Sequence, residues 1–127
     1  MQPPPQPQQV QTEFDSKGQY ERVLPHLFQG EALYFVFDLK GSGTGFIGIT
    51  DWRIIFIDQD FLDRKDTALV TVPYARISYV AVQTERKRFA RDDSSITVAV
   101  TGKTFEFEFN GTQKALRAAN AITHICK

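Results

Sequence analysis

The sequence has little of several things that would point to a specific chemistry. It contains one cysteine, Cys126, among 127 residues, which excludes an internal disulfide framework and a multi-cysteine zinc site and fits a reducing compartment. No apolar run approaches the roughly 20 residues that span a bilayer, and the start lacks the charged and apolar regions of a secretory signal. The sequence therefore predicts a soluble cytoplasmic protein.

An excess of charge of one sign is also missing. Lys and Arg number 15, and Asp and Glu number 15, so the formal net charge is zero. Proteins that bind phosphate backbones usually carry a basic excess, which disfavours a nucleic-acid partner. Histidine occurs only as His26 and His124, and no G-x-S-x-G motif is present, so no pair of nucleophile and base can be named. We expect neither enzymatic activity nor a cofactor.

Three patterns match ligand-binding motifs only superficially. Residues 43–48 read G-x-G-x-x-G, but a strand follows instead of a helix, which predicts a glycine-rich hairpin turn. Residues 58–66 hold four aspartates without the glycine and glutamate of a calcium loop, which predicts a solvated acidic loop. His124 and Cys126 would diverge by about 200° on a helix, so they cannot readily share a metal ion. We expect no metal site.

The residues that are present divide the chain into three parts. Residues 1–16 open with proline and glutamine and are predicted to be a disordered tail. Residues 4–7 have the P-x-x-P spacing of peptides that dock in aromatic grooves, but the absence of flanking basic residues favours a solubilising leader. Residues 17–29 form a short helical segment in which Pro25 predicts a kink or break near Leu24. Residues 30–127 form one domain.

Beyond Gly30 the apolar residues recur at about every second position instead of every 3.6 residues, and this alternation is typical of strands. The small Gly48 between apolar neighbours predicts a close backbone approach. The nearly continuous apolar run over residues 53–57 predicts a strand that is covered on both faces. Seven strands are expected, over residues 32–39, 46–50, 53–57, a fourth through Val70 and Val72 to Pro73, 77–84, 96–101 and 104–109.

The last segment has the pattern of an amphipathic helix. Asn110 is a suitable N-cap, and Gln113 stands in capping-box position. The helix should dock on the strand that carries Phe105, Phe107 and Phe109, because a helix this short is only marginally stable on its own. Its apolar stripe is predicted to consist of Leu116, Ala119, Ile122, Ile125 and Cys126, with Lys114, Arg117, Asn120 and Thr123 facing away.

This order of elements resembles the pleckstrin-homology (PH) fold, and several motifs are similar to bacterial PH-like domains of the YokE-like type. They are Gly30-Glu31 before the first strand, GITDWRIIF over residues 48–56, VPYARI over residues 72–77, and the Phe105-Glu106-Phe107 strand with its following helix. The resemblance covers residues 30–127. It implies a mainly β fold: a PH-like barrel of about seven antiparallel strands in two sheets, capped by a C-terminal α-helix, with a short N-terminal helical segment.

For function, the resemblance implies a scaffold or interaction module, of a kind that in some cases assembles into rings, without shared catalytic residues. Phosphoinositide-binding PH domains concentrate basic residues around the first loop between strands. This sequence offers only Lys40 there and, after the second strand, Arg53. Recognition of a phosphoinositide headgroup is therefore not implied.

One loop carries a candidate contact site for an anion, a membrane or a partner. Its basic residues could hold headgroups or phosphates while the aromatic side chain inserts into a lipid interface or a partner pocket. Three acidic residues leave the loop, residues 85–93, with a net charge of only plus one, which favours a hairpin kept soluble by mixed charge. The candidate residues are Arg86, Lys87, Arg88, Phe89 and Arg91.

Two functional hypotheses follow. The first is a non-catalytic interaction module that acts through a protein partner or through self-association. Its fifth strand, residues 77–84 with Tyr79 exposed, would be an edge available for pairing. The alternative is peripheral binding of anionic lipid or phosphate groups through the loop over residues 85–93.

Overall fold

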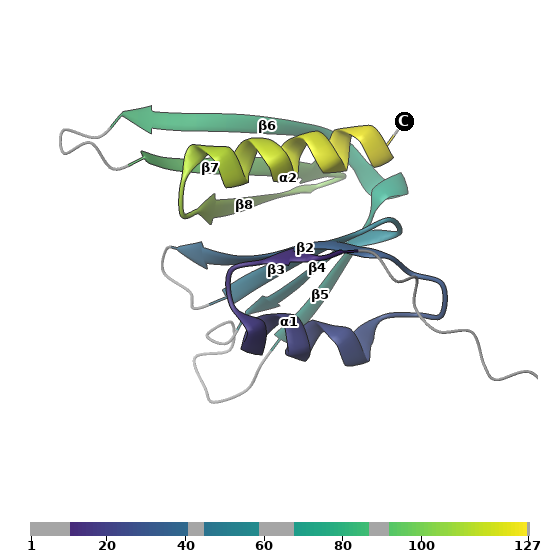
Figure 1. Cartoon of the computed structure of the whole chain (residues 1–127). Helices are drawn as coiled ribbons and strands as arrows, with labels where there is room; N and C mark the ends of the chain where they lie inside the picture. The colour runs from purple at the N-terminus through teal and green to yellow at the C-terminus, as the bar shows by residue number, and fades with distance from the viewer. Residues whose placement is uncertain (1–10, 41–44, 59–67, 87–91, 127) are drawn as a thin grey trace, which may run out of the picture.

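The computed structural model describes residues 11–40, 45–58, 68–86 and 92–126. The chain forms two stacked layers of β-sheet with one helix on the outside of the lower layer and a second helix beside the upper layer (Figure 1). No helix in these residues is long and apolar enough to cross a membrane.

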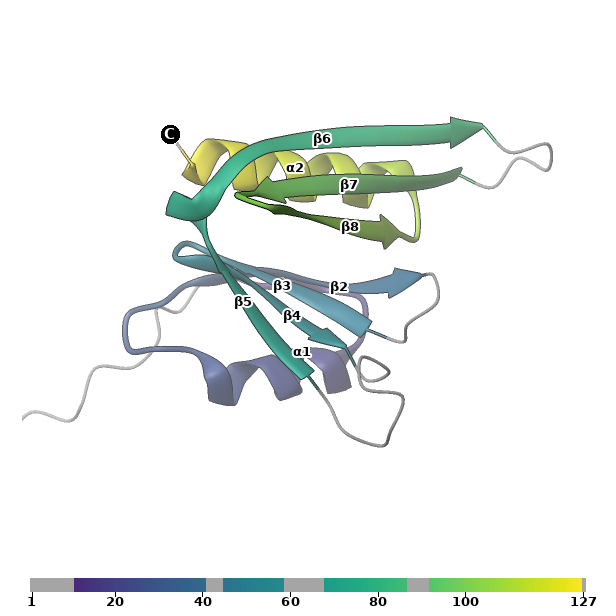
Figure 2. The ribbon, with the colours of Figure 1, turned by 180° about the vertical axis from the view of Figure 1, so that it is seen from behind.

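All seven predicted strands are present as antiparallel neighbours in the order β5-β4-β3-β2-β8-β7-β6. Only two residue pairs, Leu39–Phe109 and Lys40–Glu108, join β2 to β8, so the sheet bends there into two halves. In the described residues the outer strands β5 and β6 do not pair with each other, which leaves the sheet open (Figure 2). The strands are β2 (Leu33–Lys40), β3 (Gly45–Thr50), β4 (Arg53–Asp58), β5 (Ala68–Pro73), β6 (Ile77–Arg86), β7 (Asp92–Val100) and β8 (Lys103–Phe109).

The main core lies between the two halves of the sheet. Alternating apolar side chains of each half point inward, as the period of two requires. Phe37 of β2 and Phe109 of β8 meet edge to face with ring centroids 6.0 Å apart, and Phe56 and Phe107 meet similarly at 5.3 Å. All of the predicted phenylalanine face of β8 contributes to this core or packs against it.

A second, smaller core lies on the outer face of the β2–β5 half. Helix α1 (Lys17–Val23) begins at Ser16, whose side chain accepts a hydrogen bond from the Gln19 backbone. It gives way at Leu24 to a 3-10 turn, η1 (Leu24–His26), as Pro25 predicted. Fully buried Val23 packs here with Leu33, Val36, Phe46, Ile55 and Ile57. Strand β4 is therefore covered on both faces, which confirms the interpretation of its continuous apolar run.

Helix α1 approaches this face closely because Gly48 has no side chain. A Cβ atom built at Gly48 would lie 3.3 Å from Cγ1 of Val23 and 3.5 Å from Cδ1 of Leu33. The close approach predicted at Gly48 is thus between β3 and α1.

A short strand that the sequence did not indicate lies within the segment assigned to the tail. β1 (Glu13–Phe14) runs parallel to β2, pairing Glu13 with Phe35 and Phe14 with Val36. The Thr12 hydroxyl donates to the Leu33 carbonyl over 2.7 Å, and the Asp15 amide donates to the Val36 carbonyl over 3.1 Å. Residues 12–15 are therefore part of the folded unit, whereas residues 1–10 lie outside the described residues.

Helix α2 (Thr112–Ile125) packs mainly against β6, β7 and β8, so the predicted docking is confirmed, but two details were wrong. The N-cap is Gly111 at a φ of 118°, a conformation that favours glycine, whereas the Asn110 amide donates instead to Asp38. Leu116 is 38% exposed. The buried stripe consists of Ala115, Ala118, Ala119 and Ile122, because small side chains allow the helix close to the sheet.

Candidate functional site

Strand β6 is the edge of the upper half of the sheet, as predicted for residues 77–84. In the described ladder it pairs only with β7, over nine residue pairs from Ile77–Val100 to Arg86–Asp92. Tyr79 is 55% exposed and Val82 is 39% exposed. Val80 packs against the main core, and alternation along the strand puts Val82 on the same side as Val80. The outward row of β6 is therefore Tyr79, Ala81 and Gln83.

Over residues 77–84 the β6 edge has little of the usual protection against pairing with another chain, since its charged residues, Glu85 and Arg86, stand at the far end of the strand. Natural edge strands carry charged residues, prolines or bulges, or are kept short. Residues 77–84, read ISYVAVQT, hold no charge and no proline, and the one register irregularity falls at the start of the strand, between Ile77 and Tyr79. The opposite edge, β5, is shorter and ends at Pro73. The β6 edge is therefore the better template for an added strand.

The predicted basic loop falls largely outside the described residues. Of its five candidate residues only Arg86 is described, at the end of β6, where the register sets it opposite Asp92 of β7. The structure gives no placement for Lys87, Arg88, Phe89 or Arg91. The described ends of β6 and β7 extend beyond β8 and α2 (Figure 1).

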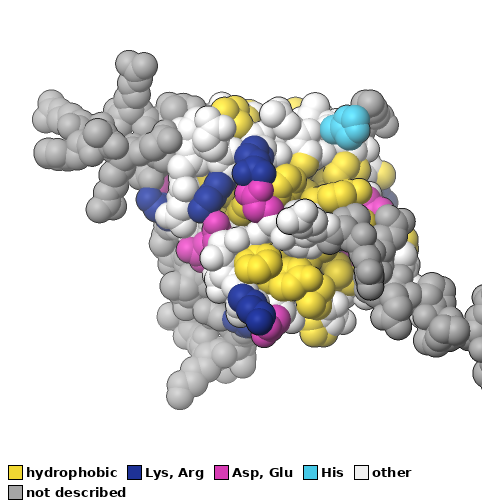
Figure 3. Space-filling view, viewed as in Figure 1, with side chains coloured by type: hydrophobic (Ala, Val, Ile, Leu, Met, Phe, Trp, Pro, Cys, Tyr) yellow, Lys and Arg dark blue, Asp and Glu magenta, His cyan; other side chains and the backbone are white. Residues whose placement is uncertain are grey.

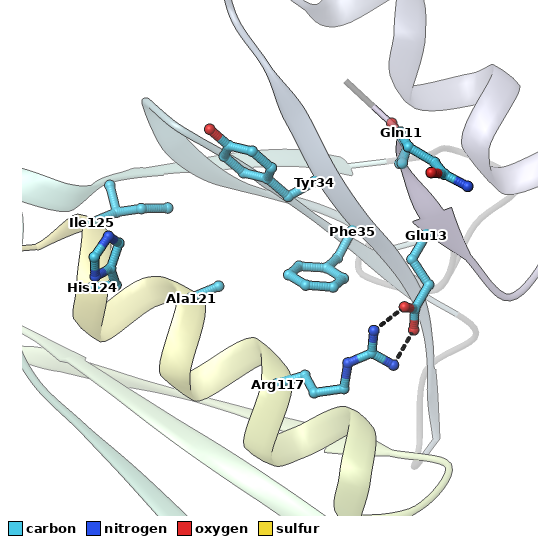
Figure 4. Close-up of a pocket in the computed structure, with 9 residues that line it drawn as sticks. Gln11, Glu13, Tyr34, Phe35, Arg117, Ala121, His124 and Ile125 are labelled. Carbon is cyan, nitrogen blue, oxygen red and sulfur yellow. Dashed lines mark hydrogen bonds and ion pairs between the residues drawn. The ribbon is translucent and has the colours of Figure 1, made fainter. Parts of the chain in front are cut away.

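A groove lies between helix α2 and the N-terminal segment. It has a volume of about 650 Å³. Hydrophobic side chains gather on this face of the molecule, bordered by acidic and basic ones (Figure 3). Its lining residues come from three distant parts of the chain: Gln11, Thr12 and Glu13, then Tyr34 and Phe35, then Arg117, Ala121, His124 and Ile125 (Figure 4).

A β-bulge explains why two consecutive aromatic residues line this groove. Neighbours in a regular strand point to opposite faces. Between Leu33 and Phe35 the register of β2 against β3 shifts, since Leu33 opposes Thr50 and Phe35 opposes Ile49, which leaves Tyr34 as an extra residue. A bulge of this kind redirects a side chain and is common next to functional sites. Tyr34 and Phe35 therefore share one groove.

Two ion pairs hold the N-terminal segment against helix α2 at one end of the groove. Arg117 forms a bidentate pair with Glu13, and its guanidinium lies over the Phe35 ring, 5.7 Å from the centroid. Lys114 contacts Asp15 over 2.6 Å. Arg117 and Lys114 were predicted to face away from the packed stripe, and they do so, but toward residues 12–15 and not toward open solvent.

A buried ionic network lies away from the groove, at the start of β2. Glu31 is fully buried, and its carboxylate accepts hydrogen bonds from Arg53 Nε over 3.0 Å and from the Thr50 hydroxyl over 2.6 Å. Arg53 also donates to the His26 carbonyl over 2.6 Å. Desolvation opposes ionisation of Glu31, but the hydrogen bonds from Arg53, Thr50 and the Phe28 backbone outweigh it and lower its pKa.

This network is structural, because its polar groups are already engaged. Arg53, the second basic residue considered for anion recognition, is only 7% exposed, and its guanidinium lies 4.3 Å from the centroid of the Phe28 ring. It therefore has no free face for a headgroup. The Tyr74 hydroxyl donates to the Thr50 carbonyl, and burial raises the pKa of Tyr74.

The remaining residues with reactive side chains do not converge. His26 lies in η1 and His124 lies on α2, both exposed. Burial raises the pKa of the Cys126 thiol, which favours its neutral, less nucleophilic form. In the parts of the chain that are described, no group of three or more His, Cys, Asp or Glu side chains is placed to hold a metal ion.

Comparisons with known proteins agree with this architecture. The family model described as bacterial PH domain matches residues 27–124. The chain is similar to the crystal structure of a pleckstrin homology domain from Shewanella amazonensis SB2B, with a TM-score of 0.64 and 18% identity over 92% of each chain. It is also similar to a DUF1696 family protein with a pleckstrin-homology domain from Shewanella loihica PV-4, with a TM-score of 0.63 and 17% identity over 91% of this chain and 97% of that one. A comparison with curated proteins gives no match.

Proposed function

Because the chain belongs to the bacterial PH domain family, we propose that it is a non-catalytic interaction module that uses the β6 edge to pair with another protein chain. The PH-like fold supports an interaction role in general. The observation that carries the specific proposal is the uncharged edge over residues 77–84, with Tyr79 more than half exposed. The partner is a second copy of this chain or a different cytoplasmic protein, and nucleic acid is not a partner.

Edge pairing would satisfy backbone groups that β7 leaves free. An added antiparallel strand gains main-chain hydrogen bonds along β6, and its alternate side chains contact the row formed by Tyr79, Ala81 and Gln83. Two copies related by a two-fold axis can pair β6 with β6, because such an interface uses the same patch twice. The β6 edge alone is therefore enough to form such a dimer.

Sedimentation velocity over a concentration series tests the self-association branch. We expect the wild-type chain to associate as its concentration rises, and the double variant Tyr79→Lys/Ala81→Lys to remain monomeric, because lysines on an edge oppose strand pairing. Thr104→Lys is the matched control, since Thr104 is exposed on the central strand β8 and adds the same kind of charge. If the wild-type chain stays strictly monomeric, self-association is excluded. Pairing with a different protein is then the remaining form of the proposal.

A second candidate function is binding of anionic lipid or phosphate groups through the loop over residues 85–93. The described ends of β6 and β7 support it, because they extend beyond the rest of the upper layer and the basic residues lie between them in the sequence (Figure 1). It predicts salt-sensitive co-sedimentation with anionic vesicles, which is lost when Arg86, Lys87, Arg88 and Arg91 all become glutamine. Equal partitioning to neutral and anionic vesicles would count against it.

A further inference from the structure

The groove beside α2 is only partly filled by the chain that borders it. At one end, Glu13 closes onto Arg117, so the two charges neutralise each other. Beyond this pair, Phe35 and Ala121 face each other across the hollow, and Tyr34 and Ile125 line its other end (Figure 4). The polar lining there comes from Gln11, Thr12 and His124. The unfilled part is thus a channel lined by two aromatic rings. Its charged lining residues, Glu13 and Arg117, pair with each other.

The chemistry of this channel suits an extended, proline-rich chain. Proline-rich segments adopt the polyproline II conformation before binding, so they lose little conformational entropy when they dock against aromatic rings. The bulge at Tyr34 sets two rings on the same side of β2, which provides such a surface. A charged peptide would gain nothing from a channel whose own charges are paired.

The chain supplies a segment of this composition at the mouth of the groove. Gln11 lines the groove, and residues 1–10, MQPPPQPQQV, immediately precede it in the sequence. These ten residues contain four prolines and no charged side chain. In polyproline II conformation they would reach about 30 Å, whereas the stretch of α2 from Arg117 to Ile125 is about 12 Å long. A tether this short holds the segment at millimolar effective concentration.

We propose that residues 1–10 fold back into the groove and occupy it in polyproline II conformation, with prolines against Tyr34 and Phe35. The segment is then an intramolecular ligand of its own domain, anchored by residues 12–15 through the contacts to β2 and α2. This inference does not depend on the β6 edge, which lies on a different strand of the sheet.

Nuclear Overhauser effects in the full chain test the proposal directly. We expect contacts between proline side-chain protons of residues 3–7 and the rings of Tyr34 or Phe35. In a mixture of isotope-labelled and unlabelled chains, these contacts should arise within one chain. Contacts between labelled and unlabelled chains would assign the groove to a second copy and would overturn the proposal.

A peptide experiment gives an independent outcome. A variant that lacks residues 2–10 should show chemical-shift changes at Tyr34, Phe35, Ala121 and Ile125, and a synthetic peptide of residues 1–10 should reverse them saturably. A peptide with its four prolines replaced by glycine should not. Ala121→Arg should abolish the peptide response, whereas Asn120→Arg, on the exposed side of α2, should retain it. Shift changes confined to residues 11–14, without a peptide response, would refute the proposal.

Discussion

At the scale of single residues, the most connected group is the buried pair of Glu31 and Arg53. Its hydrogen bonds join the start of β2, the end of β3, the start of β4 and the η1 turn. A buried ion pair is weak evidence for net stability, but removing one partner leaves an uncompensated charge, which typically costs about 3–5 kcal/mol. Arg53→Met should therefore destabilise the fold by about that amount in urea titration, and Glu31→Met added to it should recover part of the loss. A cost below about 1 kcal/mol for Arg53→Met would show that the pair is dispensable.

The same pair predicts how stability depends on pH. The folded-state pKa of Glu31 is lowered, so the unfolded chain binds its proton first as pH falls. Its contribution to stability is present above the ordinary glutamate pKa, at about pH 5 and higher, and is lost as pH falls through the lower folded-state value. The free energy of unfolding of Glu31→Gln should therefore fall less steeply below pH 5 than that of the wild-type chain. Parallel pH profiles for the two proteins would contradict the assignment.

Gly48 is a residue whose lack of a side chain determines the position of a whole helix. A Cβ there would contact Cγ1 of Val23 at 3.3 Å, tighter than ordinary van der Waals contact. We expect Gly48→Val to destabilise the chain by about 1–3 kcal/mol through overpacking. Adding Val23→Ala should recover part of this cost, because the two changes share one contact. If the effects of the two substitutions on the free energy of unfolding are additive, Val23 of α1 does not pack against the position of Gly48.

At the scale of elements, helix α2 shows where a periodic pattern succeeds and where it fails. The pattern predicted an amphipathic helix docked on the sheet, and this is confirmed. The stripe was right at Ala119, Ile122, Ile125 and Cys126, which are buried in the main core or pack against it, and wrong at Leu116. Hydrophobicity favoured Leu116, whereas the close contact with β6 and β7 buries the small residues Ala115 and Ala118. The N-cap was misassigned because a glycine with positive φ makes the turn from β8.

The corrected stripe makes a testable contrast between two residues of α2. Ile122 is fully buried, so Ile122→Ala should cost about 2–5 kcal/mol through lost burial and the cavity left behind. Leu116→Ala should cost less than about 1 kcal/mol, because Leu116 is 38% exposed and alanine favours helix. Denaturant titration of both variants checks this order. Equal costs would indicate that α2 docks with the face that its sequence pattern suggested.

Strand β1 and the bulge at Tyr34 could not be predicted by such patterns. A two-residue strand has no period, and a bulge depends on the register against β3, which the sequence of β2 alone does not encode. The seven longer strands were recognisable because each alternates or forms a bounded apolar run. The β6 edge could be anticipated as well, since the absence of charge over residues 77–84 is visible in the sequence.

At the scale of the whole molecule, the fold was predictable and the groove was not. The element order and motifs over residues 30–127 indicated the PH-like architecture, which the match over residues 27–124 and the solved neighbours support. The groove is assembled from segments that lie far apart in the chain, and its ion pair joins Glu13 to Arg117 across 104 positions. Neither residue is distinctive in its local sequence. The YokE-like type stays a prediction.

The central claim is that the β6 edge pairs with another protein chain, and hydrogen exchange at its backbone amides tests it most directly. The measurement compares dilute and concentrated samples of the chain alone, and then complexes captured from the native cell, with residues 69–72 of the shorter β5 edge as the internal control. We predict that every second amide of residues 78–84, those facing away from β7, becomes protected in the associated state while the β5 edge does not. If these β6 amides exchange at the same fast rate in dilute, concentrated and captured samples, the edge does not pair and the account is contradicted.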